Sequence, residues 1–429
     1  MVKKIFKIIA ILLVIVIAGT LALSIRPEYS GINYSPADSQ NESDKTIKFD
    51  SDGKLKILHM PDTHLKLNHN FEPTIWMVEK ACDEEKPDIV MLTGDIVLNC
   101  ENAEDTNKMI NALMNIFESR DIPVAVTFGN HDSERGAMSR EELMAYYNTF
   151  PCSVSVDDGE ALSGCGTYNI PVLSSDGEKV KFNLWVFDSG DYDEEGRYSC
   201  VQPDQVEWYK QVSDELAKEN GGEKVNSLAF QHIIVGEIYD ALMKSDSHKS
   251  YSYKHLYNDD EYYMFDPDRV NYGTIRETPC PGYENHGQFD AMVEKGDVLA
   301  IFTGHDHTNA FGVEYKGVDI VNSLSTRYIG LFHSTQCGYR VIEVDEKDTS
   351  TYETRVERMF DNYDFDTVKE EKENGDKFKY KMAREFAFKG AVQKFATVLY
   401  GKLIESVTGR QVTYPLIKGA INNEAHRNF

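Results

Sequence analysis

The stretch DIVMLTGD, residues 88–95, decides the fold, because an apolar strand-like run ends directly at a glycine and an acid. A helical pattern follows at residues 106–120, and the strand pattern PVAVTFGNHD follows that at 123–132. The same order precedes it, with a strand at 54–60 and a helix at 73–85. Strands and helices that alternate at this spacing predict a parallel sheet with right-handed crossovers.

After Gly136 strands and helices no longer alternate regularly. Further helices are expected at residues 140–150, 203–217 and 286–296, and further strands at 166–173, 180–191, 226–232, 297–307, 310–323 and 337–346. The first two of these strands form a hairpin around Ser175-Asp176-Gly177, and the last two segments finish the fold as antiparallel strands. The aromatic, polar stretch 239–284 is too long to be structureless in a compact domain, so we expect an ordered functional loop region.

The chain begins with a segment unlike the rest. Residues 1–25 contain lysines followed by a charge-free run from Ile8 to Leu23, which predicts an export signal or a membrane anchor. Ala22-Leu23-Ser24 offers a small-x-small cleavage site, so cleavage and anchoring both stay open. Either way we expect the bulk of the chain, exported and then membrane-anchored or secreted, to face the outside of a membrane. Residues 26–53 read as a linker that ends in at most one short strand.

The net charge and the spacing of the cysteines argue against several classes of protein and site. Without the lysine-bearing segment through Ser24, the formal net charge falls from −26 to −29, and a polyanionic chain is poorly suited to binding nucleic acid. The seven cysteines include no C-x-x-C pair, which argues against a zinc ribbon or a thioredoxin-type site. Export permits disulfides, and Cys152 and Cys165 are the nearest pair across a turn-rich segment, but an odd thiol must remain.

Polar clusters follow five of the predicted strands, each at the carboxyl end, where open α/β sheets bind ligands. They are Asp62 and His64, Asp95, Asn130 and His131, His232, and His305 with His307. Carboxylates, imidazoles and one amide oxygen are ligands of borderline metals, and a shared carboxylate can hold two ions for phosphoryl transfer. Glycines before Asp95, Asn130 and His305 permit the tight turns.

This ordered series, D-x-H, G-D, G-N-H-D, a lone His after a strand and G-H-x-H, resembles the calcineurin-like metallophosphoesterase superfamily over residues 54–345. The phrases FDSGDY (187–192) and QFDAMVEKGDVLAIFTGHDHTN (288–309), and the His232 segment ending in Glu237, look like the branch grouped with purple acid phosphatases. The resemblance implies an α/β fold, a β-sandwich of two mixed sheets flanked by helices. Beyond it, we expect a helical C-terminal extension at 346–429.

The resemblance also implies roles for the clustered residues. One metal ion would bind Asp62, His64 and His307, a second would bind Asn130, His232 and His305, and Asp95 would bridge them. His131 would protonate the leaving alkoxide or stabilise the phosphoryl oxygens, Asp132 would orient its ring, and a metal-bridging hydroxide would be the nucleophile. Arg135, Arg327 and His333 are candidates to contact substrate phosphate, although a solvated side chain is the ordinary reading of each.

The pattern departs from the coloured purple acid phosphatases at two positions. They carry a tyrosine ligand three residues after the bridging Asp, where this chain has Leu98, and a glycine where it has His64. We therefore expect no ferric-phenolate centre, and two divalent or trivalent ions (Fe, Mn or Zn) stay open. The predicted function is hydrolysis of a phosphomonoester; the alternatives are a phosphodiesterase on the same dinuclear centre or a non-catalytic binding protein that keeps the fold.

The segment 376–410 has apolar residues at helical spacing and eight Lys or Arg against three acids. A basic amphipathic helix can lie on an anionic membrane surface, and the ordinary alternative is a helix docked on its own acidic domain.

Overall fold

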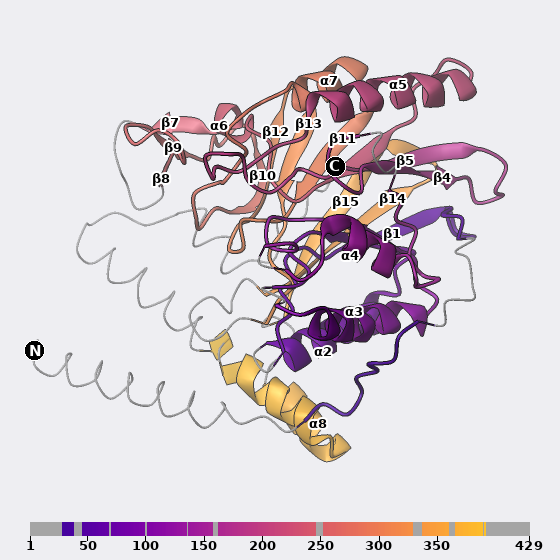
Figure 1. Cartoon of the computed structure of the whole chain (residues 1–429), viewed down its shortest axis with the longest axis vertical. Helices are drawn as coiled ribbons and strands as arrows, with labels where there is room; N and C mark the ends of the chain where they lie inside the picture. Colours follow the sequence, from indigo (N-terminus) through magenta and orange to yellow (C-terminus); the bar gives the residue numbers. More distant parts are fainter. Residues whose placement is uncertain are drawn as a thin grey trace, which may run out of the picture.

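Two mixed β-sheets packed face to face form the body of the protein (Figure 1). The computed structural model describes residues 28–37, 45–67, 70–98, 101–134, 136–157, 162–245, 252–328, 337–359, 365–388 and 390–391. The first sheet has the order β15-β14-β1-β2-β3. Its strands are β1 (Lys54–His59), β2 (Ile89–Thr93), β3 (Val124–Thr127), β14 (Gly338–Asp345) and β15 (Asp348–Arg358).

The second sheet has the order β10-β12-β13-β11-β6-β5-β4. Its strands are β4 (Tyr168–Leu173), β5 (Val180–Val186), β6 (Ser227–Phe230), β10 (Val270–Thr274), β11 (Val298–Thr303), β12 (Ala310–Tyr315) and β13 (Val318–Asn322). Each sheet contains a run of adjacent parallel strands, β1, β2 and β3 in the first and β5, β6, β11 and β13 in the second. The predicted α/β sandwich of two mixed sheets is confirmed.

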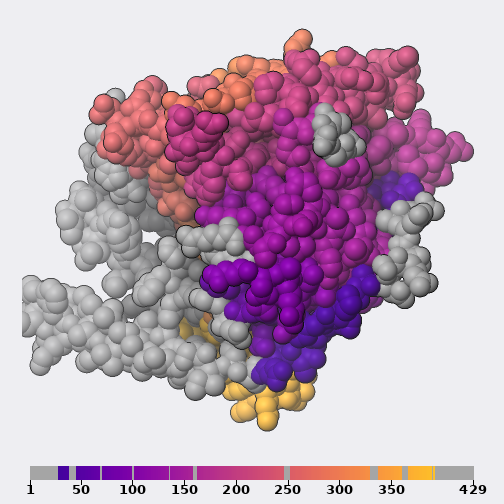
Figure 2. All heavy atoms as spheres, in the orientation of Figure 1, coloured from indigo at the N-terminus to yellow at the C-terminus, as the bar shows by residue number. Residues whose placement is uncertain are grey.

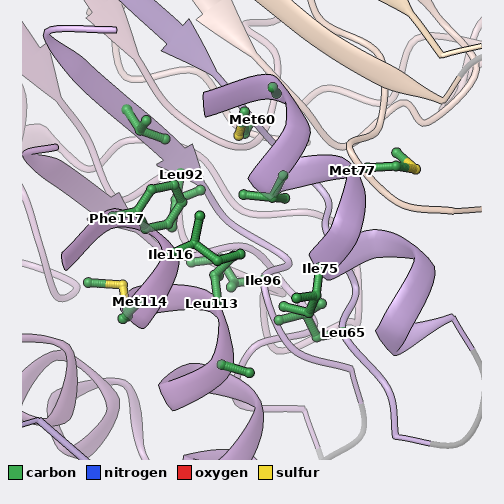
Figure 3. Close-up of a cluster of buried hydrophobic side chains, with 14 of the residues drawn as sticks. Met60, Leu65, Ile75, Met77, Leu92, Ile96, Leu113, Met114, Ile116 and Phe117 are labelled. Carbon is green, nitrogen blue, oxygen red and sulfur yellow. The ribbon is translucent and has the colours of Figure 1, made fainter. Parts of the chain in front are cut away.

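Helices cover the outer face of each sheet (Figure 1). The first sheet is covered by α2 (Phe71–Glu85), α3 (Ala103–Glu118) and α4 (Arg140–Tyr147), and the second by α5 (Pro203–Glu219) and α7 (Gln288–Lys295). Figure 3 shows side chains of α2 and α3 that meet Leu92 of β2 and the residues just after β1 and β2. A separate apolar cluster between the sheets includes Ile57, Phe230 and Phe302. This packing holds the carboxyl ends of both sets of parallel strands at one edge.

Two regions differ from the sequence expectation. The 239–284 region contains α6 (Ile238–Ala241), a small sheet of β7 (Met243–Ser245), β8 (Tyr253–Lys254) and β9 (Tyr262–Met264), and also β10 of the second sheet. The extension expected to be helical from residue 346 begins with strand β15, which pairs antiparallel with β14. The reason is local, since Thr349, Thr351 and Val356 are β-branched and a short turn returns the chain beside β14.

Both ends of the described chain pack on the first sheet's helices. Residues 377–388 are helical after α8 (Phe365–Asn374), and Phe378 and Phe386 lie against Trp76 of α2 with ring centroids 6.1 Å apart in each pair. The ring of Tyr29 lies 4.8 Å from that of Phe378. Figure 2 shows this C-terminal segment (yellow) beside the N-terminal part of the body (indigo). The described part of the basic helix is therefore docked on its own domain, whereas membrane contact stays a prediction.

Other sequence expectations concern cysteines and the leader. Among the described residues six cysteines are free, namely Cys82, Cys152, Cys165, Cys200, Cys280 and Cys337. Cys152 and Cys165, the nearest pair in the turn-rich segment, form no disulfide, and both thiols lie buried in the core around α3 and α4. The apolar run Ile8 to Leu23 lies outside the described residues. Within the part of the chain that is described, no helix has the length and apolar character needed to cross a membrane.

Candidate dinuclear metal centre

The five predicted clusters meet at one edge of the sandwich. Asp62 and His64 follow β1, Asp95 follows β2, Asn130 and His131 follow β3, His232 follows β6, and His305 and His307 follow β11. The first three loops leave one sheet and the last two leave the other. Because all five strands are parallel members of their sheets, their carboxyl ends bring the side chains together between the two sheets.

The turns that present these side chains are conformationally demanding. Among the described non-glycine residues, seven have a positive φ, and four of them are Asp62, His64, Asp95 and His305. Left-handed backbone costs an L-residue about 1–2 kcal/mol, so the surrounding packing must hold these turns in place. A Cβ on Gly129 would lie 2.3 Å from Asp95 Oδ1, and a Cβ on Gly304 would lie 2.6 Å from Asp62 Oδ2. These two positions have no room for any side chain.

A first group of donors joins the two sheets. Asp62, His64, Asp95 and His307 each offer one ligand atom, and these atoms all lie within 4.8 Å of one another. His307 Nε2 lies 3.4 Å from Asp62 Oδ1, and His64 Nε2 lies 3.4 Å from Asp95 Oδ2. His64 Nε2 also lies 2.9 Å from His307 Nε2. Two imidazole nitrogens and two carboxylate oxygens that converge in this way are a donor set for a borderline metal ion.

A second group shares Asp95 with the first and adds His232 and His305. His232 Nε2 lies 3.4 Å from Asp95 Oδ2 and 3.2 Å from His305 Nδ1. The other nitrogen of His232, Nδ1, donates to the Thr93 carbonyl at 2.9 Å. That bond leaves Nε2 unprotonated in the neutral ring and aimed at the centre, which is the usual arrangement for a metal-binding histidine.

The oxygen atoms of the cluster test whether cations fit. Asp62 Oδ1, Asp95 Oδ2 and Asn130 Oδ1 are buried and have no hydrogen-bond partner among the described residues. A buried acceptor without a partner costs about 1–3 kcal/mol, and three in one place are exceptional. The amide of Asn130 donates instead through Nδ2 to the hydroxyl of Tyr192 at 2.7 Å, which turns Oδ1 away from Tyr192. These residues could therefore hold a pair of metal ions, and a cation on each side of Asp95 would satisfy all three oxygens.

The electrostatics of the cluster also favour cations. Burial alone would raise the pKa of Asp62, but His307 and His64 hold it well below its ordinary value. Burial disfavours the charged form of His232, yet the neighbouring Asp95 raises its pKa to about 10. Without metal, a proton on His232 compensates the buried carboxylates, and a metal ion would displace that proton.

His131 lies at the mouth of the centre and has a partner that the sequence interpretation missed. Its Nδ1 lies 2.5 Å from Glu134 Oε2. The expectation that Asp132 orients the ring is wrong. The Asp132 carboxylate points inward and accepts backbone N–H groups of Gly129, Asp95, Ile96 and Val97 at 2.7–3.2 Å. Asp132 thus joins the loop after β3 to the loop after β2. Its carboxylate is close enough to accept all four backbone N–H groups, so both oxygens are fully hydrogen-bonded there.

A model of the family described as calcineurin-like phosphoesterase matches residues 55–309, more than half of the chain. The chain belongs to this family.

Curated relatives of this calcineurin-like phosphoesterase carry several kinds of name. "Probable inactive purple acid phosphatase 14" of Arabidopsis thaliana is 26% identical over 67% of this chain and 74% of its own length. "Probable inactive purple acid phosphatase 29" of the same plant is 27% identical over 66% and 74%. "Phosphatase DCR2" of Saccharomyces cerevisiae is 24% identical over 61% of this chain and 45% of its own. Among solved structures, a dimetal phosphatase from Danio rerio is 14% identical, covers 70% of this chain and 95% of its own, and has a TM-score of 0.45.

Supporting side chains surround the centre of this phosphoesterase. Asp188 pairs with Arg140 Nη1 at 2.7 Å, and Arg140 Nη2 donates to the Gly129 carbonyl at 2.9 Å, so the FDSGDY stretch braces the loop that carries Asn130. Asp306, between His305 and His307, is buried and accepts the Cys280 N–H at 3.2 Å. His59, the last residue of β1, is buried between Ser323 and Thr93, whose hydroxyls lie 2.9 and 2.6 Å from its ring nitrogens.

The three candidate phosphate contacts fall in different places. Burial lowers the pKa of the Arg327 guanidinium, and the charges of Asp62 and Asp95 oppose that shift, so Arg327 lies within electrostatic reach of the centre. Arg135 and His333 lie outside the described residues. Sequence interpretation missed Glu134 and Tyr192. The only signal for Tyr192 was the FDSGDY phrase, whereas Glu134 gave none beyond its place three residues after His131.

Proposed function

We propose that this protein is a metal-dependent phosphatase that hydrolyses a phosphomonoester. The observation that carries the proposal is the set of seven convergent donors whose buried carboxylate and amide oxygens lack hydrogen-bond partners. One ion is assigned to Asp62, His64 and His307 and the other to Asn130, His232 and His305, with Asp95 shared between them. When bound, the two ions would supply Lewis-acid polarisation of a phosphate ester and of a water molecule.

The chain's own residues would do the remaining work. His131 has its Nδ1 hydrogen-bonded to Glu134, which keeps the proton on Nδ1 in the neutral ring and holds the plane of the imidazole. As an imidazolium, His131 would donate from Nε2 to the leaving alkoxide. Arg327 is assigned to the phosphoryl oxygens, because within the described part of the chain no carboxylate forms an ion pair with it and a guanidinium suits phosphate.

The names of the relatives point in two directions, since some are called probable inactive phosphatases and another is called a phosphatase. In this chain all seven donor positions are filled and His131 has its partner, which supports catalysis over a binding-only role. Export is kept as a prediction from residues 1–25.

Turnover of p-nitrophenyl phosphate and of its bis-ester by the full chain, loaded with Mn²⁺ or with Fe and Zn, tests the proposal. We expect faster release from the monoester, and loss of about 100-fold or more in Asp95→Asn, because the shared carboxylate is removed from both ions. Asp345→Asn, a matched change at a partly buried acid that faces Lys54 at the end of β1 away from the centre, should keep its activity. Preference for the bis-ester would replace the phosphatase by a phosphodiesterase. Two bound ions without turnover of either ester would favour the binding protein.

A further inference from the structure

The FDSGDY stretch that follows β5 ends at Tyr192, whose hydroxyl reaches the donor cluster. Asn130 Nδ2 donates to this hydroxyl at 2.7 Å, while Asn130 Oδ1 faces the centre without a partner. The opposite orientation of the amide would aim two N–H donors at the position of a cation. The hydroxyl of Tyr192 therefore acts as the acceptor in this bond.

The hydroxyl of Tyr192 has one proton left to donate. A tyrosine hydroxyl has one proton, and a bond accepted from an amide N–H does not use it. Among the described residues, no acceptor takes that proton. That proton is therefore available to a ligand that enters beside Asn130, whose Oδ1 faces the centre.

The position of Tyr192 is fixed by a small hairpin. A β-bridge joins Tyr192 to Tyr198, and Ser199 N–H donates to the Asp191 carbonyl at 3.1 Å. The rings of Tyr192 and Tyr198 stack at 5.6 Å, and the ring of Tyr198 meets that of His305 edge to face at 4.3 Å. The hairpin is thus held against both Asn130 and His305, and the hydroxyl of Tyr192 lies beside Asn130.

We propose that Tyr192 is a substrate-contacting residue, whose hydroxyl accepts from Asn130 and donates its proton to a non-bridging phosphoryl oxygen of the bound ester. The inference rests on the proposed function and adds a neutral donor, from the second sheet, to the phosphate site. A hydrogen bond to a charged acceptor contributes about 1.5–3 kcal/mol. Only the hydroxyl matters for this role, because the ring serves to stack on Tyr198.

The test compares Tyr192→Phe with Tyr283→Phe. Tyr283 belongs to the same aromatic neighbourhood, since its N–H donates to the Tyr198 carbonyl at 2.9 Å, but the residue is 49% exposed. Each full-length protein is loaded with Mn²⁺ until two ions are counted, and the dissociation constant of inorganic phosphate is measured by calorimetry. We expect at least a 10-fold weaker phosphate affinity in Tyr192→Phe and less than a twofold change in Tyr283→Phe.

Other results would overturn the inference. Equal phosphate affinity in Tyr192→Phe and the wild type, at equal metal content, would show that the Tyr192 hydroxyl does not contact the bound phosphate. A loaded wild type that binds no phosphate rejects both the inference and the proposed function. A wild type that binds phosphate but hydrolyses no ester rejects the proposed function alone, because the comparison of affinities still decides the role of Tyr192.

Discussion

Asp132 and Glu134 lie two residues apart in the loop after β3 and have unrelated partners. Asp132 is buried and holds four backbone N–H groups, whereas Glu134 is partly exposed and holds the ring of His131. Removal of Asp132 would leave buried donors unpaired and damage the loop as a whole. Glu134 lies at the surface of the centre, so its removal tests the behaviour of His131 without that damage.

At this scale we predict that Glu134→Ala slows esters with poor leaving groups more than esters with good ones. A leaving alkoxide needs a proton, whereas nitrophenolate leaves without one, so loss of the His131 partner should reduce kcat for an alkyl phosphate by about 10-fold and leave p-nitrophenyl phosphate little changed. Unfolding free energy should change by less than about 0.5 kcal/mol. Glu194→Ala removes an acid at an exposed position and controls for net charge. Equal slowing of both esters would contradict the role given to Glu134.

At the scale of elements, the turns that follow the strands set the positions of the candidate metal ligands. Gly94 directly follows β2 and has a φ of +82°, and a Cβ there would lie 2.4 Å from the Gly129 nitrogen and 2.7 Å from His232 Nδ1. Gly177, in the hairpin between β4 and β5, has a similar φ of +78°, but a Cβ there meets nothing within 4 Å. The two positions separate the cost of a left-handed backbone from the cost of crowding the centre.

Alanine at each position gives the corresponding prediction. Gly177→Ala should lose about 1–2 kcal/mol of unfolding free energy from the left-handed backbone. Gly94→Ala should lose that amount and about 1–3 kcal/mol more from overpacking, because backbone atoms of the next loop cannot move aside cheaply. Urea unfolding measures both values, and a metal count on the folded variants should show the loss in Gly94→Ala alone. Identical unfolding curves for the two variants would show that the turn after β2 has room to spare.

At the scale of the whole molecule, the centre joins the two sheets. Asp62, His64, Asp95 and Asn130 come from loops of the first sheet, and His232, His305 and His307 come from loops of the second. Ions bound here would therefore resist separation of the two halves of the sandwich. A ligand that binds only the folded state stabilises it in proportion to the logarithm of its concentration.

We predict that Mn²⁺ at 100 times its dissociation constant adds about 2.7 kcal/mol to the unfolding free energy for each site filled. Differential scanning calorimetry with Mn²⁺ and with a chelator measures the gain as a rise in Tm. Asp95→Asn should lose most of the gain, since both ions share that carboxylate. The same Tm in chelator and in Mn²⁺ would show that the folded protein does not bind the ion at this edge.

The order of helices and strands and the positions of the donor residues could be predicted from the sequence, because both follow from the local pattern of apolar and polar residues. Parallel strands with polar residues at their ends can be recognised without knowing which strands pair. The orientation of side chains could not be read in this way. Asp132 and Glu134 are both acids near His131, and only the fold of the loop decides which one faces the ring. Strand β15 was missed because its side chains are mostly polar and show no apolar alternation. Its hydrogen bonds to β14 hold it in the sheet instead.

The pairing of β1 with β14 has a consequence for the order of events during synthesis. Lys54 faces Asp345 and His59 faces Arg340 in this antiparallel pair. The first strand of the body can therefore pair on this side only after one of the last strands has been synthesised. Contacts so far apart in sequence form slowly, and a growing chain keeps one edge of β1 open until β14 has been made. Such an edge invites pairing with other chains. A ribosome-bound or truncated chain that stops before residue 338 is therefore the form most exposed to aggregation, and the form for which a chaperone would matter most.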